Sequence, residues 1–147
     1  MRVDLYFDGG GSHQGSPAGW GWVCTLDGEE YMNGRGGLAP GTTNNVAEYE
    51  ALIRAAMFAI AHDWGFSPVG NEDVIFNFYG DSDLVVSQIA GVYAVRSPNL
   101  RGQYERAMHM LEPLDFRLTW IPRKMNARAD MLATEGRQDY RYVMEHA

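Results

Sequence analysis

The sequence lacks several features that mark whole classes of protein. It has 147 residues and a single cysteine, Cys24, so no disulfide can form within the chain. No stretch approaches the roughly 18 consecutive apolar residues of a membrane-spanning helix. The charged residues Arg2, Asp4 and Asp8 do not fit a secretory signal peptide. Cys24 lies in an apolar stretch and is predicted to be a small core residue in a reducing compartment. We therefore expect a cytoplasmic protein with no membrane partner.

Internal repeats, low-complexity tracts and long linkers are also missing. Hydrophobic residues make up 46% of the chain, a proportion typical of globular proteins. Residues 1–147 are therefore predicted to form a single domain that buries one core. We expect a monomer, because no feature of the sequence implies a protein partner.

Basic residues are scarce in the first part of the chain. The net charge of −7 argues against a nucleic-acid partner, because phosphates are bound by lysine and arginine. Residues 1–95 hold 3 basic and 12 acidic side chains, whereas residues 96–147 hold 9 basic and 7 acidic ones. The acidic part could supply a metal site and the mildly basic part could lie along phosphates. A soluble acidic surface explains the same numbers equally well, so charge alone leaves both interpretations open.

Hydrophobic periodicity predicts an α/β fold. Val3, Leu5 and Phe7 alternate with polar residues, which is typical of a strand. Further strands are expected over residues 20–26, 28–37, 74–80 and 116–121. Helices are expected over residues 42–65, 82–91, 97–113 and 126–136, with a further terminal helix over 137–147. The order β-β-β-α-β-α-α-β-α predicts a five-stranded mixed sheet, an antiparallel meander followed by parallel strands, flanked by helices.

Helix ends carry their own signals. Thr43, Asn44 and Asn45 are all candidate caps of the first helix, and Asn45 with Glu48 three residues later fits a capping box. Ser97 followed by proline predicts the start of the helix over residues 97–113. The apolar stripe of that helix includes Met108, which is predicted to fill the core together with Met110. The segment 67–73 is predicted to be a loop.

Four acidic side chains stand where α/β proteins place their chemistry. Asp8 ends the first strand before a glycine-rich loop, and Asp81 follows the fourth strand. Glu48 lies near the start of the first helix, and Asp130 lies near the start of the last one. If the first and fourth strands are parallel neighbours, Asp8 and Asp81 are only about 5 Å apart laterally. The four carboxylates are therefore predicted to meet at one edge of the sheet.

Carboxylates this close cannot all stay ionised without a cation. Two magnesium ions would relieve the repulsion, because hard divalent cations take oxygen ligands and bring phosphates with them. Such a pair, about 4 Å apart, can activate a water and stabilise the leaving oxygen of a phosphodiester. Each residue alone also has a plainer explanation: Glu48 as a capping-box acid, Asp81 as a helix cap, and Asp130 as a first-turn acid. Asp8 is harder to explain that way, because an acid after an apolar strand is costly without a role.

Four stretches in sequence order resemble the type 1 ribonuclease H family. They are "YFDGGGSHQGSPAGWGWV", "TTNNVAEYEALIRAA", "GDSDLVVSQIAGVYAVRSPNL" and "WIPRKMNARADMLA", and they cover nearly the whole chain. The resemblance implies the ribonuclease H-like fold, with the order of elements predicted above. It also implies a metal-dependent endonuclease that hydrolyses the RNA strand of RNA–DNA hybrids by a two-metal-ion mechanism, leaving 3′-hydroxyl and 5′-phosphate ends. Mg²⁺ is the expected ion, with Mn²⁺ as an alternative.

The resemblance also assigns roles to individual residues. The family's four catalytic, metal-binding carboxylates correspond to Asp8, Glu48, Asp81 and Asp130. Asn44 and Asn45 match the asparagines that contact the minor groove of the hybrid, although helix capping explains them too. An amide can donate to and accept from the 2′-hydroxyl that distinguishes RNA from DNA.

The chain departs from the family pattern at three places. Many members carry a histidine before the last helix; here the loop is "PRKMNA", and Arg123 is the nearest substitute, as in an archaeal-like subgroup. Arginine cannot exchange a proton at neutral pH, so it is expected to bind phosphate. Asp83 replaces a common glutamine and is expected either to face away or to hold a water of a metal ion. A basic helical insertion is missing, which predicts modest, salt-sensitive affinity. His13, beside the glycine loop, is expected to be structural or solvated.

Two alternatives use the same residues. One is a hybrid-binding module without catalysis, and the other is a different nuclease of this fold, such as a junction resolvase. All four carboxylates are present, which counts against the first. The "TTNN" and "ADMLA" stretches favour ribonuclease H over the second.

Overall fold

The chain folds around one five-stranded sheet with the order β3-β2-β1-β4-β5. The computed structural model describes residues 1–65 and 74–147, so the loop predicted over 67–73 lies outside the described residues. The strands are β1 (Val3–Gly10), β2 (Ala18–Leu26), β3 (Glu29–Leu38), β4 (Phe76–Gly80) and β5 (Phe116–Trp120). The helices are α1 (Asn44–Ala61), α2 (Asp83–Ile89), α3 (Pro98–Leu111), the 3₁₀ turn η1 (Arg123–Met125) and α4 (Ala127–His146).

The sheet is mixed, as predicted. The first three strands pair antiparallel, and β4 and β5 join them in parallel, with β4 hydrogen-bonded to β1. Phe7 of β1 stands opposite Gly80 of β4, so the carboxyl ends of these two strands lie side by side. This register puts Asp8, which lies within β1, and Asp81, which follows β4, at the same edge. The prediction that Asp8 ends the first strand is wrong, because β1 continues through Gly9 and Gly10, which pair with β2.

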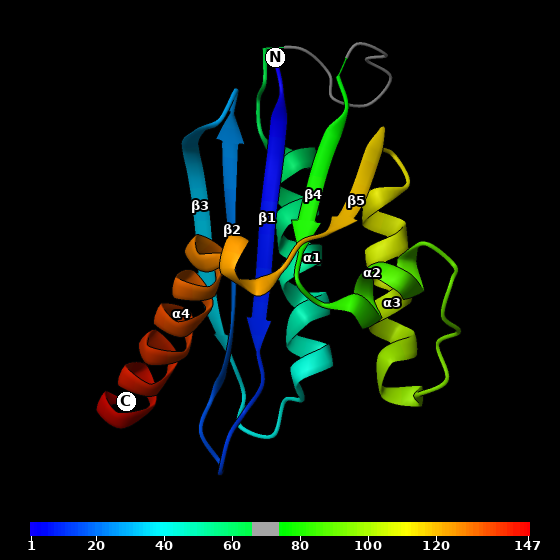
Figure 1. Cartoon of the computed structure of the whole chain (residues 1–147). Helices are drawn as coiled ribbons and strands as arrows, with labels where there is room; N and C mark the ends of the chain where they lie inside the picture. Colours follow the sequence, from blue (N-terminus) through cyan, green and yellow to red (C-terminus); the bar gives the residue numbers. More distant parts are fainter. Residues whose placement is uncertain (66–73) are drawn as a thin grey trace.

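Helices cover both faces of the sheet (Figure 1). Val3, Leu5 and Phe7 are fully buried on the face covered by α1, confirming the alternation predicted for this strand. On the opposite face α4 packs closely on β2 and β3. A side chain at Gly21 would place its Cβ 2.6 Å from the backbone nitrogen of Ala133, so the close approach of α4 requires glycine there.

The start of α1 agrees with one of the three predicted caps and excludes the other two. Thr43 is the N-cap, and its hydroxyl accepts a hydrogen bond from the backbone N–H of Val46. The capping box of Asn45 and Glu48 is therefore wrong, because the cap lies two residues earlier. Capping no longer accounts for Asn44, Asn45 or Glu48.

Two further helix predictions need correction. Met108 is exposed, because its position on α3 faces outward, whereas Met110 is partly buried against the core. The two helices predicted over residues 126–136 and 137–147 are one helix, because α4 runs without a break from Ala127 to His146. Ser97 caps α3 with proline after it, as predicted, but its side chain makes no capping hydrogen bond. None of the helices in residues 1–65 and 74–147 combines the length and apolar character needed to cross a bilayer.

Candidate active site

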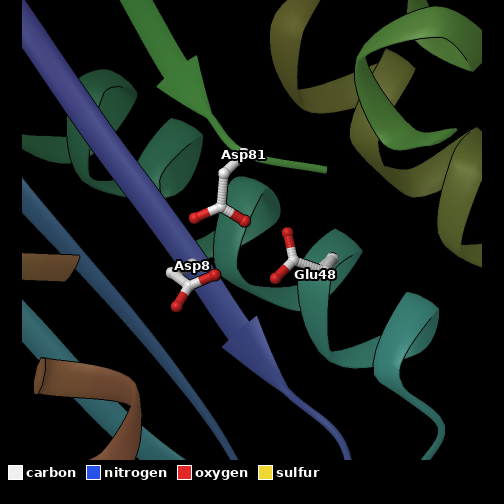
Figure 2. A group of neighbouring side chains, drawn as sticks. All are labelled: Asp8, Glu48 and Asp81. Carbon is white, nitrogen blue, oxygen red and sulfur yellow. The ribbon is translucent and has the colours of Figure 1, made fainter. Parts of the chain in front are cut away.

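Three carboxylates converge at the edge where β1 and β4 end. Asp8 lies on β1, Asp81 directly follows β4, and Glu48 projects from α1; Figure 2 shows them facing a common space. One oxygen from each lies within 4.8 Å of the others. Asp8 and Glu48 are 5% and 2% exposed, so their charges are largely withdrawn from water.

Glu48 reaches this site because α1 lies directly on β1. The backbone N–H of Gly9 donates to Glu48 Oε1 at 2.9 Å. A Cβ on Gly9 would lie 2.2 Å from the carbonyl carbon of Ala47, so only glycine permits this contact. Gly9 thus allows α1 to pack directly on β1, which places the carboxylate of Glu48 next to Asp8.

Asp81 is held by groups from distant parts of the chain. Ser82 caps α2 through its hydroxyl, which leaves the Asp81 carboxylate free of that role. The side-chain amide of Asn126 donates to Asp81 Oδ2 at 3.0 Å and to the backbone oxygen of Phe7 at 2.8 Å. The indole N–H of Trp120 donates to the backbone oxygen of Asp81 at 3.2 Å. The helix-cap explanation of Asp81 is therefore wrong.

The cluster is electrostatically unfavourable without a cation. Burial, followed by the neighbouring carboxyl of Glu48, raises the pKa of Asp8 far above its ordinary value. Burial also raises the pKa of Glu48, while hydrogen bonds from Asp8 and Gly9 oppose that rise. Glu48 Oε2 is buried and has no hydrogen-bond partner among the described residues. An oxygen without a partner, in a set of carboxylates, fits a hard divalent cation such as Mg²⁺.

Asp130 lines the same cavity but lies farther from the other three carboxylates. It lies in the first turn of α4 and lines a hollow of about 250 Å³ together with the three carboxylates. Its side chain is 43% exposed, and Asp130 Oδ1 lies 3.9 Å from Arg123 Nη2. Within residues 1–65 and 74–147, the group whose oxygens lie within 4.8 Å comprises Asp8, Glu48 and Asp81 and leaves out Asp130. The four predicted carboxylates therefore share one cavity, three of them in close contact.

Of the three predicted substrate-binding residues, two line the cavity and one does not. Asn44 lines the cavity, and its Oδ1 accepts a hydrogen bond from the backbone N–H of Gly11 at 3.1 Å. Arg123 also lines the cavity, with a side chain that is 81% exposed. Asn45 is half-buried and is not among the residues lining the cavity. Contacts of these three residues with nucleic acid stay predictions.

Asp83 does not line the carboxylate cavity. Its carboxylate accepts hydrogen bonds from Tyr93 at 3.0 Å and from Ser87 at 3.3 Å. Asp83 therefore ties α2 to the segment that follows it, in agreement with the expectation that it faces away.

Asn126 is the residue of this site that sequence reasoning missed. It is 2% exposed, and a buried asparagine in a polar loop has no local signal, since its partners lie on β1 and after β4. Its only sequence clue is its place four residues before Asp130. Its amide orients Asp81 as outer-sphere groups orient the ligands of metal sites.

We predict that Asn126→Ala weakens Mg²⁺ or Mn²⁺ binding about 10- to 100-fold, because Asp81 loses its orienting donor. It should also lower the free energy of unfolding by roughly 1–3 kcal/mol, because the backbone oxygen of Phe7 loses its partner. Calorimetric metal titration and urea unfolding measure the two effects. Asn33→Ala, which removes an exposed amide bonded to Glu30, is the control and should change neither. Unchanged metal affinity in Asn126→Ala would show that Asp81 needs no orientation from this amide.

The strand order and the carboxylate cluster together define a ribonuclease H-like α/β protein with a candidate metal site. A family model described as reverse transcriptase-like matches residues 6–136. Ribonuclease HI of Halobacterium salinarum is 40% identical over 140 residues, which cover 94% of this chain and 65% of that protein. A bifunctional protein of Mycobacterium tuberculosis is 31% identical over 137 residues, which cover 92% of this chain and 35% of that protein. The chain thus spans less than two thirds of these relatives' length.

Solved structures similar in fold point to the same family as the relatives found by sequence. Ribonuclease H1 of Halobacterium salinarum is 38% identical with a TM-score of 0.79, and the match covers 95% of this chain and 99% of that one. LC11 ribonuclease H1, in complex with an RNA/DNA hybrid, is 33% identical with a TM-score of 0.83 and the same coverage. The chain belongs to the type 1 ribonuclease H family.

Proposed function

We propose that this protein is an endonuclease that hydrolyses the RNA strand of RNA–DNA hybrids, leaving 3′-hydroxyl and 5′-phosphate ends. The observation that carries the proposal is the buried group of Asp8, Glu48 and Asp81, whose oxygens lie within 4.8 Å of one another. The structural relative bound to an RNA/DNA hybrid supports this substrate. Residues 1–147 act as one such unit, in the cytoplasm and as a monomer.

The four carboxylates would hold two Mg²⁺ ions, or Mn²⁺ in their place; Asp8, Glu48 and Asp81 form the buried group, and Asp130 is the more exposed residue. Bound ions would supply Lewis acidity and an activated water for phosphodiester hydrolysis. The side chains themselves impose the geometry: Gly9 and Asn126 hold Glu48 and Asp81 in place through the hydrogen bonds described above. The more exposed carboxylate of Asp130 leaves that side of the cavity accessible to substrate.

The two asparagines at the start of α1, together with Arg123, select the substrate. Asn44 and Asn45 face the minor groove of the hybrid, where amides can bond to 2′-hydroxyls. The guanidinium of Arg123, at the mouth of the cavity, binds a phosphate and does not transfer protons. This leaves RNA-strand selectivity to the 2′-hydroxyl contacts and binding strength to the phosphates.

A cleavage assay tests the proposal. Labelled RNA–DNA hybrid, double-stranded DNA, double-stranded RNA and branched DNA are each incubated with Mg²⁺, Mn²⁺ or chelator. We expect cleavage of the RNA strand of the hybrid only, dependent on metal and reduced at least about 10³-fold in Asp81→Asn. Asp139→Asn, at an exposed position of α4, is the matched control and should cleave normally.

Two other outcomes of this assay would indicate a different function. Binding of the hybrid without cleavage in either metal would indicate a binding module. Cleavage of branched DNA in preference to the hybrid would indicate a junction resolvase.

A further inference from the structure

A second hollow adjoins the carboxylate cavity along α4. Thr134 and Arg137 line both hollows, so the two lie next to each other. We call the second hollow the α4 groove, defined by residues of α4 and of the loop between β1 and β2: His13, Gln14, Ser16, Thr134, Arg137, Gln138 and Arg141. Every one of these side chains can donate a hydrogen bond, and none is acidic.

Acidic and basic side chains in the middle of α4 lie on different faces of the helix. The acidic residues Glu135 and Asp139 both pair with Arg35 of β3, away from the groove. Arg137 and Arg141 have no carboxylate within ion-pair distance in residues 1–65 and 74–147. The two arginines are four residues apart and so lie on one face of the helix, about 6 Å apart along its axis. The α4 groove is therefore cationic in a protein whose net charge is −7.

Arg137 is held in place before any ligand binds. Its Nη2 donates to the backbone oxygen of Gly11 at 3.2 Å, and a Cβ on Gly10 would lie 2.5 Å from the same nitrogen. Arg137 Nε is buried and has no hydrogen-bond partner among the described residues. Arg137 also lines both hollows, and a guanidinium fixed there suits a phosphate, whose oxygens accept from it in pairs.

We propose that the α4 groove binds the backbone of the RNA strand next to the cleaved phosphodiester, with one phosphate on Arg137 and the next on Arg141. The inference rests on the proposed function, because the groove adjoins the cavity where the RNA strand would be cleaved. It adds a phosphate subsite on the side of the cavity lined by Gly10 and Gly11. Phosphate contacts set affinity and register, whereas the asparagines discriminate RNA from DNA.

The test measures binding of a fluorescent RNA–DNA hybrid by anisotropy in the inactive Asp81→Asn background. Arg137→Ala and Arg141→Ala together should weaken binding at least about 10-fold and reduce the salt slope of log K by nearly 2, because two phosphate contacts are lost. Arg117→Ala removes the same charge from exposed β5, at the opposite edge of the sheet from β3, and should change affinity less than about 2-fold.

Two additional variants protect the test against a folding defect. Arg141 is exposed, so Arg141→Ala alone should keep the wild-type melting temperature and still weaken binding. Arg137→Lys keeps the positive charge but loses the paired donors of the guanidinium. This variant should bind the hybrid less tightly than wild type but more tightly than Arg137→Ala. In the active protein, Arg141→Ala should raise KM with little change in kcat.

The outcomes separate the subsite from the function. Hybrid cleavage by the wild-type chain, together with unchanged affinity and salt slope in the double variant, would overturn the subsite and leave the proposed function intact. Failure of the wild-type chain to bind or cleave the hybrid would overturn both.

Discussion

Replacing Asp8 with asparagine is expected to abolish cleavage and, at the same time, to raise the melting temperature of the metal-free protein. Activity should fall at least about 10³-fold, because one of the proposed metal ligands is removed. Stability should rise by about 1–3 kcal/mol, because a buried carboxyl with a raised pKa is replaced by a neutral amide of the same size. For a chain of this length the gain corresponds to roughly 3–10 °C.

The effect of Asp8 on stability has a definite pH dependence. Its folded-state pKa lies above the ordinary value of 3.8, so its contribution to stability is complete below that value and is lost as pH rises toward the folded pKa. The difference in melting temperature between Asp8→Asn and wild type should therefore be small near pH 4 and should widen through neutral pH. Added Mg²⁺ should narrow it, because metal binding stabilises the wild-type protein more than the variant.

Asp4→Asn is the matched control for this prediction. Asp4 lies on the same face of β1 and is also buried, but it pairs with Arg2 at 2.9 Å and accepts a hydrogen bond from Asn77 at 3.2 Å. Removing a paired buried charge should lower the melting temperature without abolishing cleavage. Scanning calorimetry from pH 4 to 9, with and without Mg²⁺, makes the comparison. If Asp8→Asn melts below wild type at every pH, the cluster is not strained in the metal-free protein.

Gly9→Ala is expected to cause the largest loss of stability, more than about 3 kcal/mol, and to prevent folding in the extreme case. The new Cβ would lie 2.2 Å from both the carbonyl carbon and the oxygen of Ala47, and 2.5 Å from the nitrogen of Glu48. All three are backbone atoms of α1, so no side-chain rotation can relieve the overlap. The helix would have to move away from β1, which breaks the hydrogen bond from Gly9 to Glu48 and opens the core beneath it.

Gly102→Ala offers the same chemical change without the overlap. Gly102 lies in α3, is exposed, and has no atom within 4 Å of an added Cβ. This substitution should stabilise the protein by about 0.5–1 kcal/mol through helix propensity. Urea unfolding of both variants measures the contrast. A loss below about 1 kcal/mol in Gly9→Ala would mean that α1 does not depend on this close contact with β1.

Local patterns were sufficient for the architecture. The alternation of Val3, Leu5 and Phe7 predicted the buried face of β1, and the order of strands and helices predicted a mixed sheet. Both follow from the period of side chains along strands and helices, which neighbouring residues alone determine. The meeting of Asp8 and Asp81 was predicted only on the condition that the first and fourth strands are parallel neighbours, and the structure meets that condition.

Only the tertiary structure decided what each polar group near the site bonds to. Glu48 is a sequence candidate for a capping box, yet it accepts from Gly9, because Thr43 takes the cap and α1 lies directly on β1. Asn126 reaches partners 119 and 45 residues away in the chain. The α4 groove depends on Arg137 lying against Gly10 and Gly11. Such contacts depend on strand register and on the distance between helix and sheet, which are properties of the whole packed core and leave no periodic trace in the sequence.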